Sequence, residues 1–221
     1  WVMKVQLGMR CLQFEYSLQE VTPFQLKIKG LNRKVPWLET DKSVISGSEK
    51  ILAAIENYPL GAKYPVPEDC DILKGTLYVR LVEDHLWWAI CVSKYFGPEA
   101  KKVYERILPS LLRFLSSITA FFGEKEFDRR IKITSLGGLS HEEIVQEARK
   151  DIAVLSARLS HSTFIAGNGL SAYDFTVAAH LASILYWSFD NWLADLFREE
   201  QIFYQYLDRV ADAVGGFEFR S

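Results

Sequence analysis

The hydrophobic pattern of this chain changes its period at a stretch rich in proline and glycine, residues 59–69. Pro59, Gly61, Pro65 and Pro67 fall within that stretch, and prolines so close together break any regular element. Before it, the clearest pattern alternates with a period of two, as in a strand. After it, apolar residues recur every three or four positions, as in helices. The pattern predicts an α/β half over residues 1–58, a linker over residues 59–69 and an all-helical half over residues 70–221.

The α/β half is expected to contain short strands between two helices. The first dozen residues have helical spacing, and Leu12 to Gln19 then alternates apolar and polar side chains without error, which predicts a half-buried strand. Val35 to Leu38 predicts a second strand that opens on a proline, and Val44-Ile45 a brief third one. Ser48 is placed to cap a helix over Glu49 to Tyr58. A mixed sheet with helices on both faces would satisfy this order.

The helical half begins with a long predicted helix whose apolar stripe runs from Leu73 to Tyr95. A second helix is expected around residues 103–121, kinked at Pro109 and ended by Gly123. Capping boxes at Ser140 to Glu143 and at Ser171 to Asp174 predict the starts of two more helices. Small residues in the helix after Asp174 predict close packing at the centre of a bundle.

Composition narrows the classes of function and the compartment. The formal net charge is -2, so electrostatics favour neither nucleic acid nor an acidic membrane surface as a partner. The longest apolar stretch, Leu111 to Phe122, is too short to span a bilayer. Cys11, Cys70 and Cys91 form no disulfide framework, which favours a reducing, cytoplasmic setting. We recognise no signal peptide, and a first residue Trp1 in place of methionine suggests that the natural start is missing.

Two positions in the α/β half are candidate ligand contacts. The Val35-Pro36 bond is a candidate cis peptide, which would turn the backbone groups of Val35 outward to pair with a bound peptide. Ser48, at a helix N-terminus, is suited to a carboxylate. Taken alone, a trans bond and a plain N-cap are the commoner outcomes for these two features.

Taken together, the two features resemble the glutathione transferase superfamily. That superfamily combines a Val-Pro strand, a short strand and a serine that opens a helix, followed by a helical half. Phe164 to Asp174 is similar to its "F-x-x-G-…-S/T-x-x-D" segment. Arg80 to Trp88, with the run Glu-Asp-His-Leu-Trp-Trp, resembles the signature of the branch that holds the failed-axon-connections and metaxin-like proteins.

The resemblance implies a thioredoxin-like first half, incomplete at its start, followed by a glutathione S-transferase helical domain. The glutathione site would consist of Val35, Pro36, Gly47 and Ser48, with Val35 holding the cysteinyl backbone and Ser48 the γ-glutamyl carboxylate. The superfamily usually has an acidic residue where this chain has Gly47, which weakens the expected hold on the ligand's amino group. The catalytic residue, a hydroxyl or thiol donor that stabilises the thiolate, is expected upstream of Trp1.

The same resemblance places the start of the long helix beside the cleft, so Asp84, His85 and Trp88 are expected to line a second-substrate pocket. The helical stripe by itself favours a packing role for His85. His141 precedes two glutamates without metal-ligand spacing, and no metal site is expected.

Two functional hypotheses follow from the sequence. The first is an enzyme that conjugates glutathione, as its co-substrate, to a small hydrophobic electrophile without a metal, and the resemblance suggests a homodimer. The second is a non-catalytic module on the same fold that serves protein interaction or trafficking, because one fold can host both.

Overall fold

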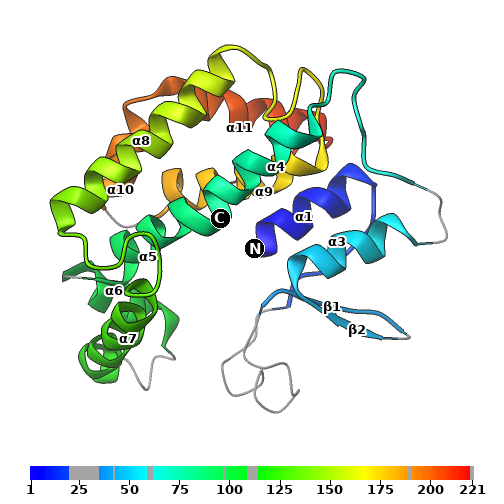
Figure 1. Ribbon diagram of the computed structural model, residues 1–221. Helices are drawn as coiled ribbons and strands as arrows, with labels where there is room; N and C mark the ends of the chain where they lie inside the picture. Colours follow the sequence, from blue (N-terminus) through cyan, green and yellow to red (C-terminus); the bar gives the residue numbers. More distant parts are fainter. Residues whose placement is uncertain are drawn as a thin grey trace.

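The computed structural model describes residues 1–19, 35–41, 43–58, 62–96, 98–108, 114–188 and 191–219. Figure 1 shows a small α/β half beside a larger group of helices. Among the described helices, none has the length and hydrophobicity that a membrane span requires.

The α/β half consists of helix α1 (Val2–Cys11), strands β1 (Trp37–Glu39) and β2 (Val44–Ser46), and helix α3 (Ser48–Glu56). The strands pair antiparallel, with Leu38 opposite Ile45. Leu38 and Ile45 pack on a small core of four apolar side chains from α1 and α3, namely Val5, Met9, Ile51 and Ile55. The two later predicted strands and both helices are therefore confirmed.

The strand predicted from Leu12 to Gln19 is not formed among the described residues. A turn with Gln13 at φ 58° follows α1, and residues 14–19 are irregular. The alternation still sorts the side chains, because Phe14 and Tyr16 are half-buried against the small core while Glu15 is exposed. Alternation alone predicts which side chains face the core, whereas a strand also needs a backbone partner.

The start of α3 differs from the prediction by one residue. Gly47 precedes the helix with φ 98°, a left-handed conformation that favours glycine, and Ser48 is the first helical residue instead of the cap. Ser48 is 8% exposed. Residues 62–71 run without regular structure to the first helix of the helical half.

The long helix at the start of the helical half is confirmed, with a change of pitch that the sequence did not predict. Helix α4 (Ile72–Arg80) continues through a π-helical segment η1 (Leu81–Leu86) into α5 (Trp87–Tyr95). The π-helical segment changes the directions of its side chains relative to those of an α-helix. Such segments are rare and frequently occur at functional sites.

The next predicted helix forms as two helices, α6 (Pro98–Ile107) and α7 (Ser116–Ile131), and the kink predicted at Pro109 lies outside the described residues. The prediction that Gly123 ends a helix is wrong, because α7 continues through it. A Cβ atom at Gly123 would lie 1.9 Å from the hydroxyl of Tyr104, so any larger residue there would have to displace the Tyr104 side chain of α6.

Four further helices complete the bundle: α8 (His141–Ser160), α9 (Ala172–Leu185), α10 (Trp192–Arg198) and α11 (Gln201–Ala213). Both predicted capping boxes are present at the starts of α8 and α9. Helix α9 is buried along nearly its whole length, as its small residues predicted. It also packs against α1, which lies between α3 and α9 and joins the two halves.

Candidate functional site

The start of β1 and the start of α3 lie next to each other. The backbone N–H of Gly47 donates to the carbonyl of Pro36 over 3.1 Å. The Val35-Pro36 peptide is cis, and Val35 is 47% exposed. The hairpin of β1 and β2 thus brings together the four residues predicted to bind glutathione: Val35, Pro36, Gly47 and Ser48.

A cavity of about 880 Å³ adjoins one side of this surface. Its walls are the irregular segment of residues 14–19 and the β1 region from Val35 to Thr40. Helices α1 and α3 contribute Met9 and Ile55, so the floor of the cavity is apolar. Gly47 and Ser48 do not line the cavity, so the N-terminus of α3 lies outside it.

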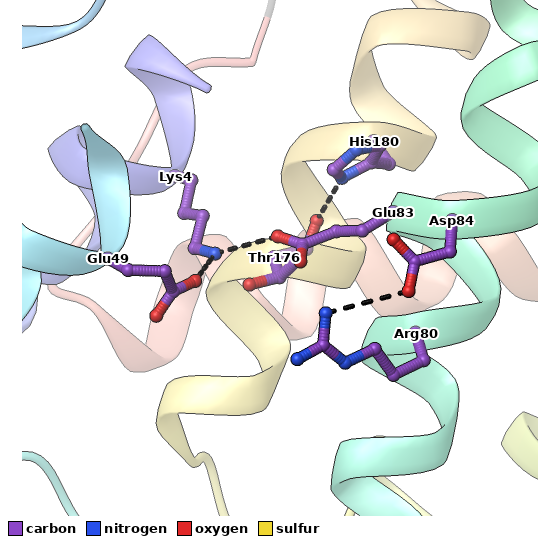
Figure 2. A network of polar contacts seen from close by, with 7 residues as sticks. All are labelled: Lys4, Glu49, Arg80, Glu83, Asp84, Thr176 and His180. Atoms are coloured by element: carbon purple, nitrogen blue, oxygen red, sulfur yellow. Dashed lines mark hydrogen bonds and ion pairs between the residues drawn. The ribbon is translucent and has the colours of Figure 1, made fainter.

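A buried lysine connects the α/β half to the helical half. The ammonium group of Lys4, in α1, forms ion pairs with Glu49 of α3 and, over 2.9 Å, with Glu83 of η1 (Figure 2). Lys4 is 1% exposed, and a charge so deeply buried is tolerated only with partners of opposite charge. Glu49 directly follows Ser48, so this network reaches the candidate ligand site.

Sequence reasoning missed Lys4. One signal was available, because Lys4 shares a helical face with Leu7 and Gly8, three and four positions further along α1. That placement indicates burial. The identity of the partners was not available, since Glu49 and Glu83 lie 45 and 79 residues away in the sequence.

The three residues predicted to line a second-substrate pocket contact different parts of the structure. Asp84 is exposed and pairs with Arg80 over 3.5 Å (Figure 2). Trp88 packs against the main core. His85 reaches α8, where its Nδ1 lies 2.7 Å from a carboxylate oxygen of Asp151. Their shared role in a substrate pocket stays a prediction.

The pair of His85 and Asp151 connects η1 to α8. Asp151 is 5% exposed, and this burial raises the pKa of its carboxyl group, although the hydrogen bond with His85 opposes the shift. Glu83, two positions before His85, instead points to Lys4. Two residues of the same turn of η1 thus make separate contacts, Glu83 with α1 and His85 with α8.

An aromatic cluster lies where α1, α5 and α9 meet. The ring of His180 is packed edge-on against Trp1 at 4.9 Å and Trp87 at 6.1 Å between centroids. Burial lowers the pKa of His180 to about 3, so its ring is neutral at physiological pH. Nδ1 lies 2.8 Å from the carbonyl of Thr176, which assigns the ring proton to Nδ1 (Figure 2).

Lys94 is a second buried cation in this region. Its ammonium group donates to the carbonyl of Ser183 over 2.7 Å, in the last turn of α9, and lies 3.9 Å from the ring centroid of Trp187. Burial lowers its pKa to about 8. A cation at a helix C-terminus is favourable, so these contacts account for Lys94 as a cap of α9.

The three cysteines are poor candidates for a nucleophile. Burial is the main cause that raises the pKa of Cys11, Cys70 and Cys91, and for Cys91 it reaches about 12. A nucleophilic cysteine requires the opposite shift, because the thiolate is the reactive form. Within the described ranges, no group of three or more His, Cys, Asp or Glu side chains is arranged to hold a metal ion.

The arrangement of an α/β half beside a bundle around α9 is that of solved glutathione S-transferases. The chain aligns with the β-etherase LigF from Sphingobium sp. strain SYK-6 at TM-score 0.64 and 17% identity, covering 96% of this chain and 91% of that one. Glutathione S-transferase III aligns at TM-score 0.61 and 13% identity, covering 95% and 86%. Glutathione transferase F7 from Populus trichocarpa aligns at 0.51 and 16%, covering 97% and 94%.

The fold is therefore the glutathione S-transferase fold, with a thioredoxin-like first half and a helical second half, as the sequence predicted. No model of a known protein family matches the chain. Among curated proteins it is similar to Failed axon connections of Drosophila melanogaster, with 26% identity over 207 residues. The match covers 86% of this chain and 47% of that protein, so the chain spans about half the length of the relative.

Proposed function

We propose that this chain binds glutathione at the surface formed by Val35 and the first turn of α3. The backbone of Val35 would pair with the cysteinyl residue of the ligand, as an added strand pairs with a sheet edge. The N-terminus of α3 at Ser48 would receive the γ-glutamyl carboxylate, because the helix dipole favours negative charge there. The hydrogen bond from Gly47 to Pro36 carries the proposal, since it keeps the two contact points adjacent.

The affinity for glutathione is expected to be modest. Gly47 provides no carboxylate for the amino group of the ligand, and the carboxylate of Glu49 is engaged by Lys4. The amino group of a bound glutathione would therefore compete with the ammonium group of Lys4 for the carboxylate of Glu49.

We further propose that the bound thiol reacts with a small hydrophobic electrophile. The solved neighbours of this fold include transferases, and the aromatic side chains of Trp1 and Trp87 at the junction of the halves offer an apolar surface. The raised pKa values of the cysteines leave thiol activation to a donor other than these side chains. Free cysteines are typical of the cytoplasm, the compartment we propose.

A non-catalytic binding module is the second candidate function. Two observations favour it. The ion pairs of Lys4 with Glu49 and Glu83 occupy charged groups at the junction of the two halves. Asp84, His85 and Trp88, the residues expected to line a substrate pocket, contact different parts of the structure. The similarity to Failed axon connections also fits a protein whose role is interaction.

Calorimetry of this chain with glutathione tests the binding proposal. We expect saturable heat for the wild type, and a loss of at least about tenfold in affinity for Ser48→Ala. Ser160→Ala, at the exposed end of α8, is the matched control and should bind like the wild type. Heat that is absent at millimolar glutathione, or unchanged in Ser48→Ala, would refute the site.

Turnover distinguishes the two candidate functions. With 1-chloro-2,4-dinitrobenzene as the electrophile, an enzyme gives a conjugation rate above the uncatalysed reaction, and Ser48→Ala lowers that rate. Glutathione binding with no turnover of this or a second electrophile would favour the non-catalytic module.

A further inference from the structure

A groove of about 2090 Å³ lies between the first helix and the end of the described chain. Residues of α1, residues 13–16 and Leu18 form one wall, and the last turns of α11 with residues 214–219 form the other. None of the four residues of the proposed glutathione site lines it. Small-molecule sites usually measure about 300–1,000 Å³, so the size of this groove suits a segment of polypeptide. We call it the α1–α11 groove.

The wall after α11 is held in place by the fold. Gly215 and Gly216 have φ of 83° and 87°, left-handed values that favour glycine and turn the chain back after the helix. The N–H of Gly216 donates to the carbonyl of Ala211 over 2.9 Å. Beyond the turn, Phe219 is 6% exposed and its ring stacks on Tyr186, with 6.4 Å between centroids. The groove is therefore bounded on this side by packed residues.

The lining of the groove includes apolar side chains that belong to both cores. Met3 and Phe217 are half-buried against the main core, and Phe14 and Tyr16 against the small core. Leu18, on the same wall as Phe14, is 64% exposed. The groove thus lies where the two halves adjoin, and it offers apolar surface to a partner.

The segment after α1 lacks a backbone partner. The N–H of Phe14 donates to the carbonyl of Met9 over 2.9 Å, whereas residues 15–18 form no backbone hydrogen bond with the described part of the chain. Unpaired N–H and C=O groups of an extended segment are a template for an added strand. An extended peptide in the groove would supply that strand.

The charges along the groove are mostly negative. Glu15 lies on one wall and Asp208, Asp212 and Glu218 on the other, and all four are exposed. None of these carboxylates forms an ion pair within the described part of the chain. Arg10 is the one basic side chain among the described lining residues, so four carboxylates and one guanidinium give a net charge of -3. This excess is complementary to a basic partner.

The position of Asp212 is unfavourable for the helix itself. Asp212 lies in the last turn of α11, and that turn contains no basic residue. The helix dipole places partial negative charge at this end, so it repels a carboxylate and attracts a cation. The groove therefore favours a cationic partner over nucleic acid or anionic lipid, which carry negative charge.

We propose that the α1–α11 groove binds an extended, basic peptide segment of a partner protein. The backbone of the peptide pairs with residues 15–18, its basic side chains face Asp208 and Asp212, and its apolar side chains lie on Phe14 and Leu18. The proposal holds whether or not the chain binds glutathione.

Fluorescence anisotropy with a labelled peptide of about seven residues, in which lysine alternates with valine, tests the proposal. We expect saturable binding to the whole chain that weakens as sodium chloride is added, because salt screens exposed charges. Asp212→Lys should raise the dissociation constant at least about fivefold, since it replaces an attraction by a repulsion. The variant should melt no lower than the wild type, because a cation is favourable at the C-terminus of α11.

Glu199→Lys is the matched control and should bind the peptide like the wild type. Glu199 is an exposed carboxylate at the C-terminus of α10, it does not line the groove, and its replacement changes the net charge by the same amount. A peptide with glutamate in place of each lysine should not bind.

Any of three results would overturn the proposal. The first is an absence of saturable binding to the wild type up to about 1 mM peptide. The second is equal weakening in Asp212→Lys and Glu199→Lys, which would indicate a general effect of net charge. The third is displacement of the peptide by an equimolar amount of spermine, which has neither backbone amides nor side chains, because the groove would then be a site for small polycations.

Discussion

The ammonium of Lys4 lies 2.9 Å from a carboxylate oxygen of Glu83, and this contact joins helix α1 to the π-helical segment η1. The partners differ in exposure, since Lys4 is 1% exposed and the side chain of Glu83 is 13% exposed. A buried ion pair is weak evidence for stability as a whole, but the loss of one partner leaves an uncompensated buried charge.

Glu83→Ala is therefore expected to lower the free energy of unfolding by about 3 kcal/mol, because Lys4 would keep a buried charge with only Glu49 beside it. Lys4→Met should cost less, since the methionine fills the same apolar space, the Glu49 side chain is exposed to water, and Glu83 is nearer to water than the ammonium of Lys4. Urea denaturation of the two variants measures the difference. Equal losses for the two variants would contradict this account of the pair.

The carboxylate of Asp174 organises the start of α9. It accepts hydrogen bonds from the backbone N–H of Ile165 over 2.8 Å, from that of Ser171 over 2.9 Å, and from the hydroxyl of Tyr206 over 2.9 Å. Asp174→Ala should cost about 3 kcal/mol or more, because two buried N–H groups lose their acceptor. Tyr206→Phe should cost about 1 kcal/mol, since the carboxylate keeps its other donors.

Denaturant melts of both variants, with Ser160→Ala as an exposed control, test this order. A loss in Tyr206→Phe as large as that in Asp174→Ala would place the main role in the hydroxyl instead of the carboxylate.

Local signals in the sequence were sufficient for α9. The box from Ser171 to Asp174 lies within four residues, so it predicts a helix start whatever surrounds it. Small residues then predicted the central position of the helix. The Val35-Pro36 step and Ser48 could be paired only through resemblance to a known family, because their proximity depends on the hairpin between them.

Contacts between distant segments could not be predicted. Gly123 has the local features of a helix end, yet the reason for glycine is Tyr104 on another helix. His85 was grouped with Asp84 by their neighbouring positions, whereas its partner Asp151 lies 66 residues away. These contacts depend on how the helices pack against one another. The periodicity of the sequence predicts which face of a helix is buried, but not which residue of another helix lies against it.

Gly123→Ala gives a test of the contact between α6 and α7. Alanine is a better helix former than glycine by about 1 kcal/mol, so propensity alone predicts a gain in stability. The added methyl group would meet Tyr104, and overpacking costs about 1–3 kcal/mol, so we expect a net loss. The double variant Gly123→Ala/Tyr104→Ala should lose less stability than the two single variants lose together, because the added methyl group no longer meets the tyrosine ring. Thermal melts of the three variants measure these losses. Simple additivity would indicate that the two residues do not touch.

His180 should make stability depend on pH in a defined window. Its pKa is lowered by burial from 6.5 to about 3 in the folded chain. Between these values the unfolded chain binds a proton that the folded chain does not, so each unit of falling pH favours unfolding by about 1.4 kcal/mol. Above pH 6.5 both states are neutral at this ring, and the effect vanishes.

The comparison of His180→Gln with the wild type isolates this contribution, because glutamine cannot be protonated in this range and the carboxyl groups titrate alike in both chains. The variant is expected to be less stable at pH 7.5, where it loses the packing of the ring against Trp1 and Trp87. As the pH falls from 6.5 to 4.5, the wild type should lose stability faster, so the difference between the two chains narrows by up to about 2.7 kcal/mol. Urea denaturation at four pH values measures it. Parallel stability curves would mean that the folded ring accepts a proton as readily as the unfolded one, through a rearrangement that exposes it at the junction of the two halves.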